Sequence, residues 1–99
     1  METRLIETLD EIIVLLRQCD EDETRIEQFL SYRERVRRNP CDRDVLAALR
    51  ILCGPRGFLG DSPHYPKAQS GLTQFQVNER VWRLVEQMDQ VLMEAGSDA

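Results

Sequence analysis

The sequence predicts an all-α domain of four helices, and three observations support this prediction. Apolar residues recur every three or four positions in four separate segments, which is typical of helices with one buried face. No segment of useful length alternates between apolar and polar residues, so no strand is expected. The 99 residues, 41% hydrophobic and 31% charged, fit one folded domain. We expect a single domain over residues 1–99, with helices at about 3–19, 22–38, 41–53 and 73–95 and a long ordered Gly/Pro-rich loop at 54–71 between the third and fourth helices.

The first expected helix has one strongly apolar face. Its apolar residues recur at spacings of three and four: Leu5, Leu9, Ile12, Leu16 and Cys19. The second helix carries a shorter apolar face made by Ile26, Phe29, Leu30 and Val36. Because only a few residues separate these two helices, we expect them to pack as an antiparallel hairpin.

Capping residues indicate where the second and third helices begin and end. Asp20 is expected to cap the second helix, with Glu23 three residues later as in a capping box. Asn39 is expected to cap the third helix, because Pro40 after it suits the first helical position. Gly54 is placed just beyond the end of that third helix.

The fourth helix has its own start and stop signals. Thr73 and Gln76 form a capping-box pattern, and Gly96 is expected to stop the helix. Between these ends, apolar residues recur at helical spacing: Phe75, Val81, Trp82, Leu84, Val85, Met88, Val91 and Leu92. Trp82, Met88 and Met93 are therefore expected in the core or at its edge.

The predicted loop at 54–71 is long for a domain of this size, and loops of that length are usually functional or disordered. Its composition is not that of a flexible linker, because it contains side chains that can pack back on the helices: Phe58, Leu59, His64 and Tyr65. Its prolines restrict the unfolded chain, and its first three glycines permit turns with positive φ. We expect an ordered loop that crosses one end of the bundle.

Charge is unevenly distributed along the chain, whose net charge is −5. Residues 1–27 have a net charge of −6, residues 28–56 of +4 and residues 57–99 of −3. Part of this asymmetry is expected to be neutralised within the domain. The remaining acidic residues could steer a basic partner towards the domain: Asp10, Glu11, Asp20, Glu21, Asp22 and Glu23.

No catalytic or cofactor-binding motif stands out. GPRGFLG, at 54–60, lacks the Lys-Ser/Thr and the preceding strand of a phosphate-binding loop. The cysteines and the histidine lack the short spacings of zinc ligands, so we expect no metal and no cofactor. His64 and Asp61 could support acid–base chemistry, but no motif places a nucleophile beside them.

The sequence also bears on location and on two classes of partner. No run approaches the roughly 20 apolar residues of a membrane span. The segment METRLIETLDEIIVLL lacks the basic region and cleavage site of a signal peptide, so a cytoplasmic location is expected. The acidic net charge argues against nonspecific binding to nucleic acid.

The stretch LAALRILCGPRGFLGD, followed by a polar gap and a last amphipathic helix, resembles a family of small uncharacterised bacterial helical proteins. That family carries a loop similar to Gly-Gly-Met-Gly-Ser-hydrophobic-Asn-Asp between two helices. The matching positions here are Gly54, Gly57, Leu59 and Asp61, and the sequence departs from the pattern at Pro55, Arg56, Phe58 and Gly60. The resemblance and the size class imply an immunity protein of the kind encoded beside bacterial toxins.

These observations favour a non-enzymatic bacterial immunity protein that binds a toxin with a basic cleft and occludes its active site. The acidic residues named above would steer the partner, and the expected loop contacts are Arg56, Phe58, Asp61, His64 and Tyr65. Two alternatives remain open. One is a homodimeric helical adaptor or regulatory module, suggested by the wide apolar faces of the first and last helices. The other is a small enzyme or ligand-binding domain that uses His64 and Asp61.

Overall fold

The computed structural model of this chain describes residues 2–97 and confirms the predicted all-α fold. Four of its helices correspond to the four expected segments. A fifth, short helix and one turn of 3₁₀ helix lie within the segment predicted as a loop. The elements are α1 (Glu2–Gln18), α2 (Glu23–Arg38), α3 (Arg43–Leu52), α4 (Phe58–Asp61), η1 (Ala68–Ser70) and α5 (Gln74–Ser97).

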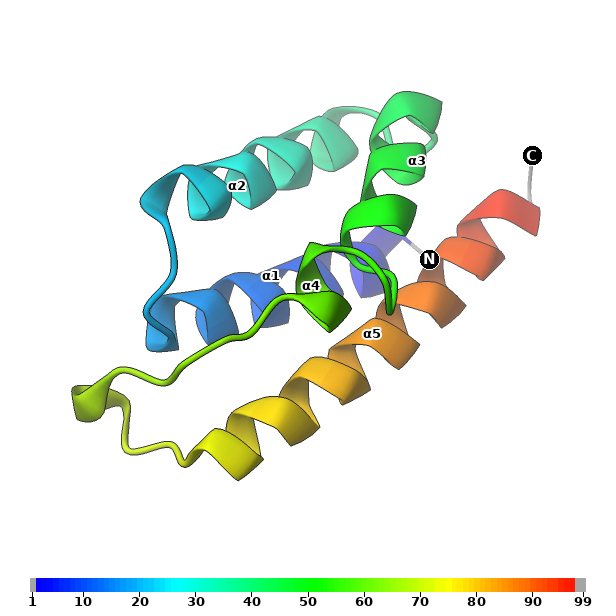
Figure 1. Cartoon of the computed structure of the whole chain (residues 1–99). Helices are drawn as coiled ribbons and strands as arrows, with labels where there is room; N and C mark the ends of the chain where they lie inside the picture. The colour runs from blue at the N-terminus through cyan, green and yellow to red at the C-terminus, as the bar shows by residue number, and fades with distance from the viewer. Residues whose placement is uncertain (1, 98–99) are drawn as a thin grey trace.

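α1 is the central helix of an elongated bundle, with Cα extents of 42 × 21 × 21 Å. It packs against both α2 and α5, and it runs antiparallel to each of them (Figure 1). The predicted hairpin of the first two helices is therefore confirmed. α3 also packs on α2, and α3 and α4 both pack on α5, which completes the bundle.

The core is built on the predicted face of α1. Its five stripe residues are all buried, and so are most of the apolar residues predicted for the other helices. Each such aliphatic side chain contributes roughly 1.5–3 kcal/mol when it leaves water. Leu30 differs from the prediction, because it is 37% exposed at the edge of α2 rather than in the core. The buried apolar residues of α1 and α2 are Leu5, Leu9, Ile12, Ile13, Leu15, Leu16, Ile26, Phe29 and Val36.

The expected caps of α2 and α3 are wrong by two and three residues. Asp22, not Asp20, caps α2, and its Oδ1 accepts the N–H of Thr24 at 3.0 Å. Asp42, not Asn39, caps α3, and Asn39 instead ends α2. Asp20 and Asn39 also have side chains that can cap a helix. Which residue becomes the cap depends on where the connecting turn places the backbone of each candidate.

The capping box at the start of α5 is confirmed. The hydroxyl of Thr73 accepts the N–H of Gln76 at 3.1 Å, and the Gln76 side chain accepts the N–H of Thr73 at 2.9 Å. The helix continues through Gly96 to Ser97. Three of its residues expected in the core or at its edge are exposed. Phe75, Trp82 and Met93 have 69%, 51% and 63% of their surface open to solvent.

Glycines shape the connection between α3 and α5 by close approach and not by the turns predicted for them. A Cβ added at Gly57 would lie 1.8 Å from the carbonyl oxygen of Ile51, and one at Gly60 would lie 2.6 Å from the Cα of Pro55. Among the glycines that the structure describes, only Gly71 has a positive φ, of 74°. The missing side chains of Gly57 and Gly60 therefore let α4 pack directly against the end of α3 and the turn that follows it.

Candidate functional site

The predicted loop contains a segment, residues 62–67, that crosses the turn between α1 and α2. We call residues 62–67 the strap. Its backbone is joined to that turn by two hydrogen bonds, from Asp20 N–H to the carbonyl of Tyr65 at 2.7 Å and from Lys67 N–H to that of Gln18 at 2.9 Å. The side chain of Gln74 also donates to the carbonyl of His64 at 2.7 Å. The strap therefore links the beginning of α5 to the end of α1.

His64 is the buried centre of the strap, with 4% of its surface exposed. Its Nε2 lies 2.9 Å from the carbonyl oxygen of Leu59, and its Nδ1 lies 3.0 Å from Oε2 of Glu21. A carbonyl oxygen can only accept, so Nε2 carries a hydrogen and donates to Leu59. Both ring nitrogens therefore have a partner, and the Nδ1 contact with Glu21 ties the strap to the α1–α2 turn.

Phe58 packs beside this histidine and completes an internal cluster. Its ring meets the His64 ring edge-on at a centroid distance of 5.1 Å, and the Phe29 ring lies 6.2 Å away. The guanidinium of Arg25 covers the Phe58 ring at 4.3 Å. Of the five predicted loop contacts, these two aromatic residues thus hold the loop in place. The other three are exposed to solvent: Arg56, Asp61 and Tyr65.

The acidic residues predicted to steer a partner divide in a similar way. Four make contacts within the domain: Asp10 with Arg33, Glu11 with Gln87, Glu21 with His64, and Asp22 as the α2 cap. The hydrogen bond from Arg33 to Asp10 also raises the pKa of that guanidinium. Asp20 and Glu23 lie exposed beside the turn between α1 and α2.

The outer face of α5 carries a second set of charged and apolar residues, which sequence reasoning missed. Its members follow one another at spacings of four and three, so they form one line along the helix. They face away from the core residues of α5, and all are exposed. We call this line the α5 outer stripe: Phe75, Glu79, Trp82, Glu86, Asp89 and Met93.

The α5 outer stripe is continuous with the strap. Phe75 and Trp82 line a hollow of about 560 Å³ together with Asn78, Glu79, Arg83 and Glu86. Trp82 also lines an adjoining hollow of about 280 Å³, whose lining includes Tyr65 of the strap. Three of the six aromatic residues of the chain therefore lie on one exposed surface. The spacing of seven between Phe75 and Trp82, out of phase with the core positions, was the signal available in the sequence.

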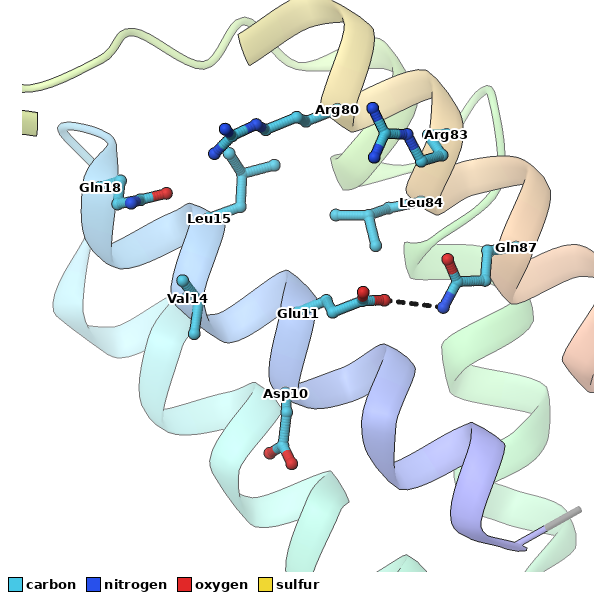
Figure 2. Close-up of a pocket in the computed structure, with 9 residues that line it drawn as sticks. All are labelled: Asp10, Glu11, Val14, Leu15, Gln18, Arg80, Arg83, Leu84 and Gln87. Carbon is cyan, nitrogen blue, oxygen red and sulfur yellow. Dashed lines mark hydrogen bonds between the residues drawn. The ribbon is translucent and has the colours of Figure 1, made fainter. Parts of the chain in front are cut away.

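A third surface is a groove between α1 and α5, with a volume of about 410 Å³ (Figure 2). We call it the α1–α5 groove. Arg80 and Arg83 stand on its α5 side, and Leu15 and Leu84 form its apolar floor. Gln87 links the two helices, since its Nε2 donates to Glu11 on α1 at 2.7 Å and to the buried hydroxyl of Thr8 at 2.8 Å.

Known chemistry and known proteins add no assignment to these surfaces. Among residues 2–97, no group of three or more His, Cys, Asp or Glu side chains is placed to hold a metal ion. No helix in the described part of the chain is long and apolar enough to cross a membrane. Comparison with family models, curated proteins and solved structures found no match.

Proposed function

We propose that this chain is a non-enzymatic protein-binding domain whose partner docks on the α5 outer stripe and on Tyr65. The exposure of Trp82 is the observation that carries this proposal. Tryptophan and tyrosine dominate binding energy at protein interfaces, because they bury a large rigid surface at low entropic cost. A half-exposed tryptophan beside an exposed phenylalanine and tyrosine is suited to that role.

The charges of the stripe indicate a basic partner. Glu79, Glu86 and Asp89 lie between the apolar anchors of the stripe, and they form no hydrogen bond or ion pair with any residue that the structure describes. Exposed carboxylates around an aromatic anchor accelerate encounter with a positively charged surface and disfavour acidic partners. Asp20, whose backbone N–H donates to the Tyr65 carbonyl, adds an exposed carboxylate next to the strap.

Within this class we propose an immunity protein that blocks the basic cleft of a toxin. The support is a small folded domain with an aromatic surface surrounded by unpaired carboxylates. A toxin that acts on nucleic acid or nucleotides needs a basic cleft to bind its substrate, and this surface complements such a cleft. The partner would cover the α5 outer stripe, and the strap would border that interface through Tyr65.

A homodimer formed through the α5 outer stripe is less compatible with its charges. Parallel packing of two copies would place each carboxylate of the stripe opposite its own counterpart. Antiparallel packing would bury carboxylates against aromatic rings or against other carboxylates. In both arrangements each copy would bury three carboxylates, and Arg83 is the one cation that lines the same hollow. Most of the buried charge would therefore stay unpaired, which is costly. We expect sedimentation at micromolar concentration to show a monomer.

The experiment that tests the proposal is capture of a partner from a lysate of the source cells with matched baits. The wild-type chain and the Trp82→Ala variant are compared, with Ile51→Ala as a control that removes an apolar side chain exposed on α3. Loss of a central tryptophan is expected to weaken binding by about 30-fold or more. A captured protein that binds both variants as strongly as the wild-type chain contradicts the proposed surface.

A further inference from the structure

The α1–α5 groove has a charge pattern opposite to that of the α5 outer stripe. Its α5 side presents two guanidinium groups one turn apart, at Arg80 and Arg83, and neither makes a hydrogen bond or ion pair with any described residue (Figure 2). The carboxylates on its α1 side are already engaged, Asp10 by Arg33 and Glu11 by Gln87. Asp10 is thus paired with a cation, whereas Glu11 keeps its negative charge because the Gln87 amide is neutral. In a chain of net charge −5, the two unpaired guanidinium groups still give the groove a net positive charge.

The floor of the groove is apolar. Leu15 and Leu84 approach one another from the two helices between the arginines and the acidic side, and Val14 adds an exposed methyl surface at the edge (Figure 2). Other arginines of the chain, such as Arg50 and Arg56, are also unpaired. Arg80 and Arg83 differ from these two arginines, because they stand beside a hollow whose apolar floor is shared by two helices.

One buried polar atom beside the α1–α5 groove also lacks a hydrogen-bond partner among the described residues. Oε1 of Gln18, which lines the end of the groove, is buried and accepts no hydrogen bond from the described chain. A buried acceptor without a partner is unfavourable, because it has lost its hydrogen bonds to water. A rotation of the terminal amide would let this oxygen accept an N–H from a molecule in the groove.

We infer that the α1–α5 groove binds a short peptide segment of another protein in which an acidic residue adjoins an apolar one. The acidic side chain pairs with Arg80 and Arg83, the apolar side chain covers Leu15 and Leu84, and a backbone N–H of the peptide donates to Gln18. A peptide supplies all three groups at the required spacing. Arginine is suited to this contact because its guanidinium meets a carboxylate with two parallel donors.

The dimensions of the groove fit a segment of this length. Its α1 side extends from Asp10 to Gln18, which corresponds to about 12 Å along the helix. An extended peptide covers that distance with about four residues at roughly 3.3 Å each. The site differs from that of the proposed function, because the stripe selects a basic partner and the groove selects an acidic segment. Arg83 borders both hollows, whereas Arg80 lines the groove and not the stripe hollow.

The test is selection of random heptapeptides, displayed on phage, against three forms of the full chain. These are the wild type, the double variant Arg80→Gln/Arg83→Gln, and the charge-matched control Arg50→Gln/Arg56→Gln on the α3–α4 surface. We expect the wild type and the control to enrich peptides that combine Glu or Asp with Leu, Ile or Phe. The groove variant is expected to lose affinity for them by at least about tenfold. Circular dichroism verifies that each variant keeps its helix content.

A second measurement locates the bound peptide. The strongest enriched peptide and its Glu→Gln or Asp→Asn counterpart are titrated into labelled protein and followed by NMR. Binding in the groove shifts the side-chain amide of Gln18 and the methyl groups of Leu15 and Leu84, and the neutral counterpart binds at least about tenfold more weakly. The inference is wrong if no acidic peptide is enriched, if the groove variant retains full affinity, or if the shifts lie elsewhere. A separate selection of basic peptides that depends on Trp82 would concern only the α5 outer stripe.

Discussion

Replacement of His64 by leucine is expected to detach the strap from the α1–α2 turn. Leucine is similar in volume, but it donates to neither the Leu59 carbonyl nor the Glu21 carboxylate, at 2.9 and 3.0 Å in the native chain. A neutral hydrogen bond contributes about 1 kcal/mol net and one to a charged group about 1.5–3 kcal/mol. The free energy of unfolding should therefore fall by about 3 kcal/mol, a large part of the roughly 5–10 kcal/mol expected for a small domain.

The assay combines urea unfolding with amide hydrogen exchange. Urea unfolding followed by circular dichroism gives the change in total stability, and Tyr65→Ala is the matched control, because that neighbour is 61% exposed. The control should change stability by less than about 0.5 kcal/mol. In the His64 variant, the amides of Asp20 and Lys67, which bond to Tyr65 and Gln18, should lose protection before the core of α1 does.

A double-mutant cycle with Glu21→Gln separates the direct contact between Glu21 and His64 from the effect of burying the His64 ring. We expect a coupling energy of about 1 kcal/mol or more between Glu21 and His64, as for other groups in direct contact. The reasoning is refuted if His64→Leu costs no more than Tyr65→Ala, or if the amides of Asp20 and Lys67 keep their protection. Either result would mean that the strap is held by its backbone hydrogen bonds alone.

Three further predictions concern the cap of α3, the thiols and a glycine contact. Hydrogen bonds from backbone N–H groups at the start of α3, together with a nearby guanidinium, lower the pKa of Asp42 in the folded chain below 3.8. The stability that these contacts add is therefore present above pH 3.8, and it is lost as the pH falls through the lowered pKa of the folded state. When the free energy of unfolding is measured against pH, the wild-type chain should be more stable than Asp42→Ala near neutral pH and equally stable in strong acid. A difference that persists in strong acid would contradict this role of Asp42. Burial raises the pKa of Cys53 to about 12 and also raises that of Cys19, whereas Cys41 is exposed. At about pH 8, Cys41 should therefore react rapidly with a disulfide reagent, and Cys19 and Cys53 should react only after the chain unfolds. Rapid reaction of two or more thiols in the native chain would count against this packing. Gly57→Ala should lower the free energy of urea unfolding by more than about 3 kcal/mol, because the added Cβ would lie 1.8 Å from the carbonyl oxygen of Ile51. An almost unchanged stability would show that α4 can shift away from α3.

The sequence by itself determined the elements whose information is local. The buried stripe of α1, from Leu5 to Cys19, follows from its spacing alone, and it is buried as predicted. The capping box of Thr73 and Gln76 needs only residues three positions apart, so it was also predicted correctly. Such features depend on the period of the helix and on short-range hydrogen bonds, which the order of residues contains directly.

Tertiary structure decided which charged and which apolar residues face solvent and which contact other parts of the domain. Whether Glu21 is free depends on His64, which lies 43 positions away, and whether Trp82 is buried depends on which side of α5 meets α1. The amphipathic period identifies two faces of a long helix, but it does not show how much of the apolar surface the rest of a small domain can cover. α5 has more apolar surface than its neighbours bury, and the remainder, with unpaired carboxylates around it, is the exposed stripe on which the proposed function rests.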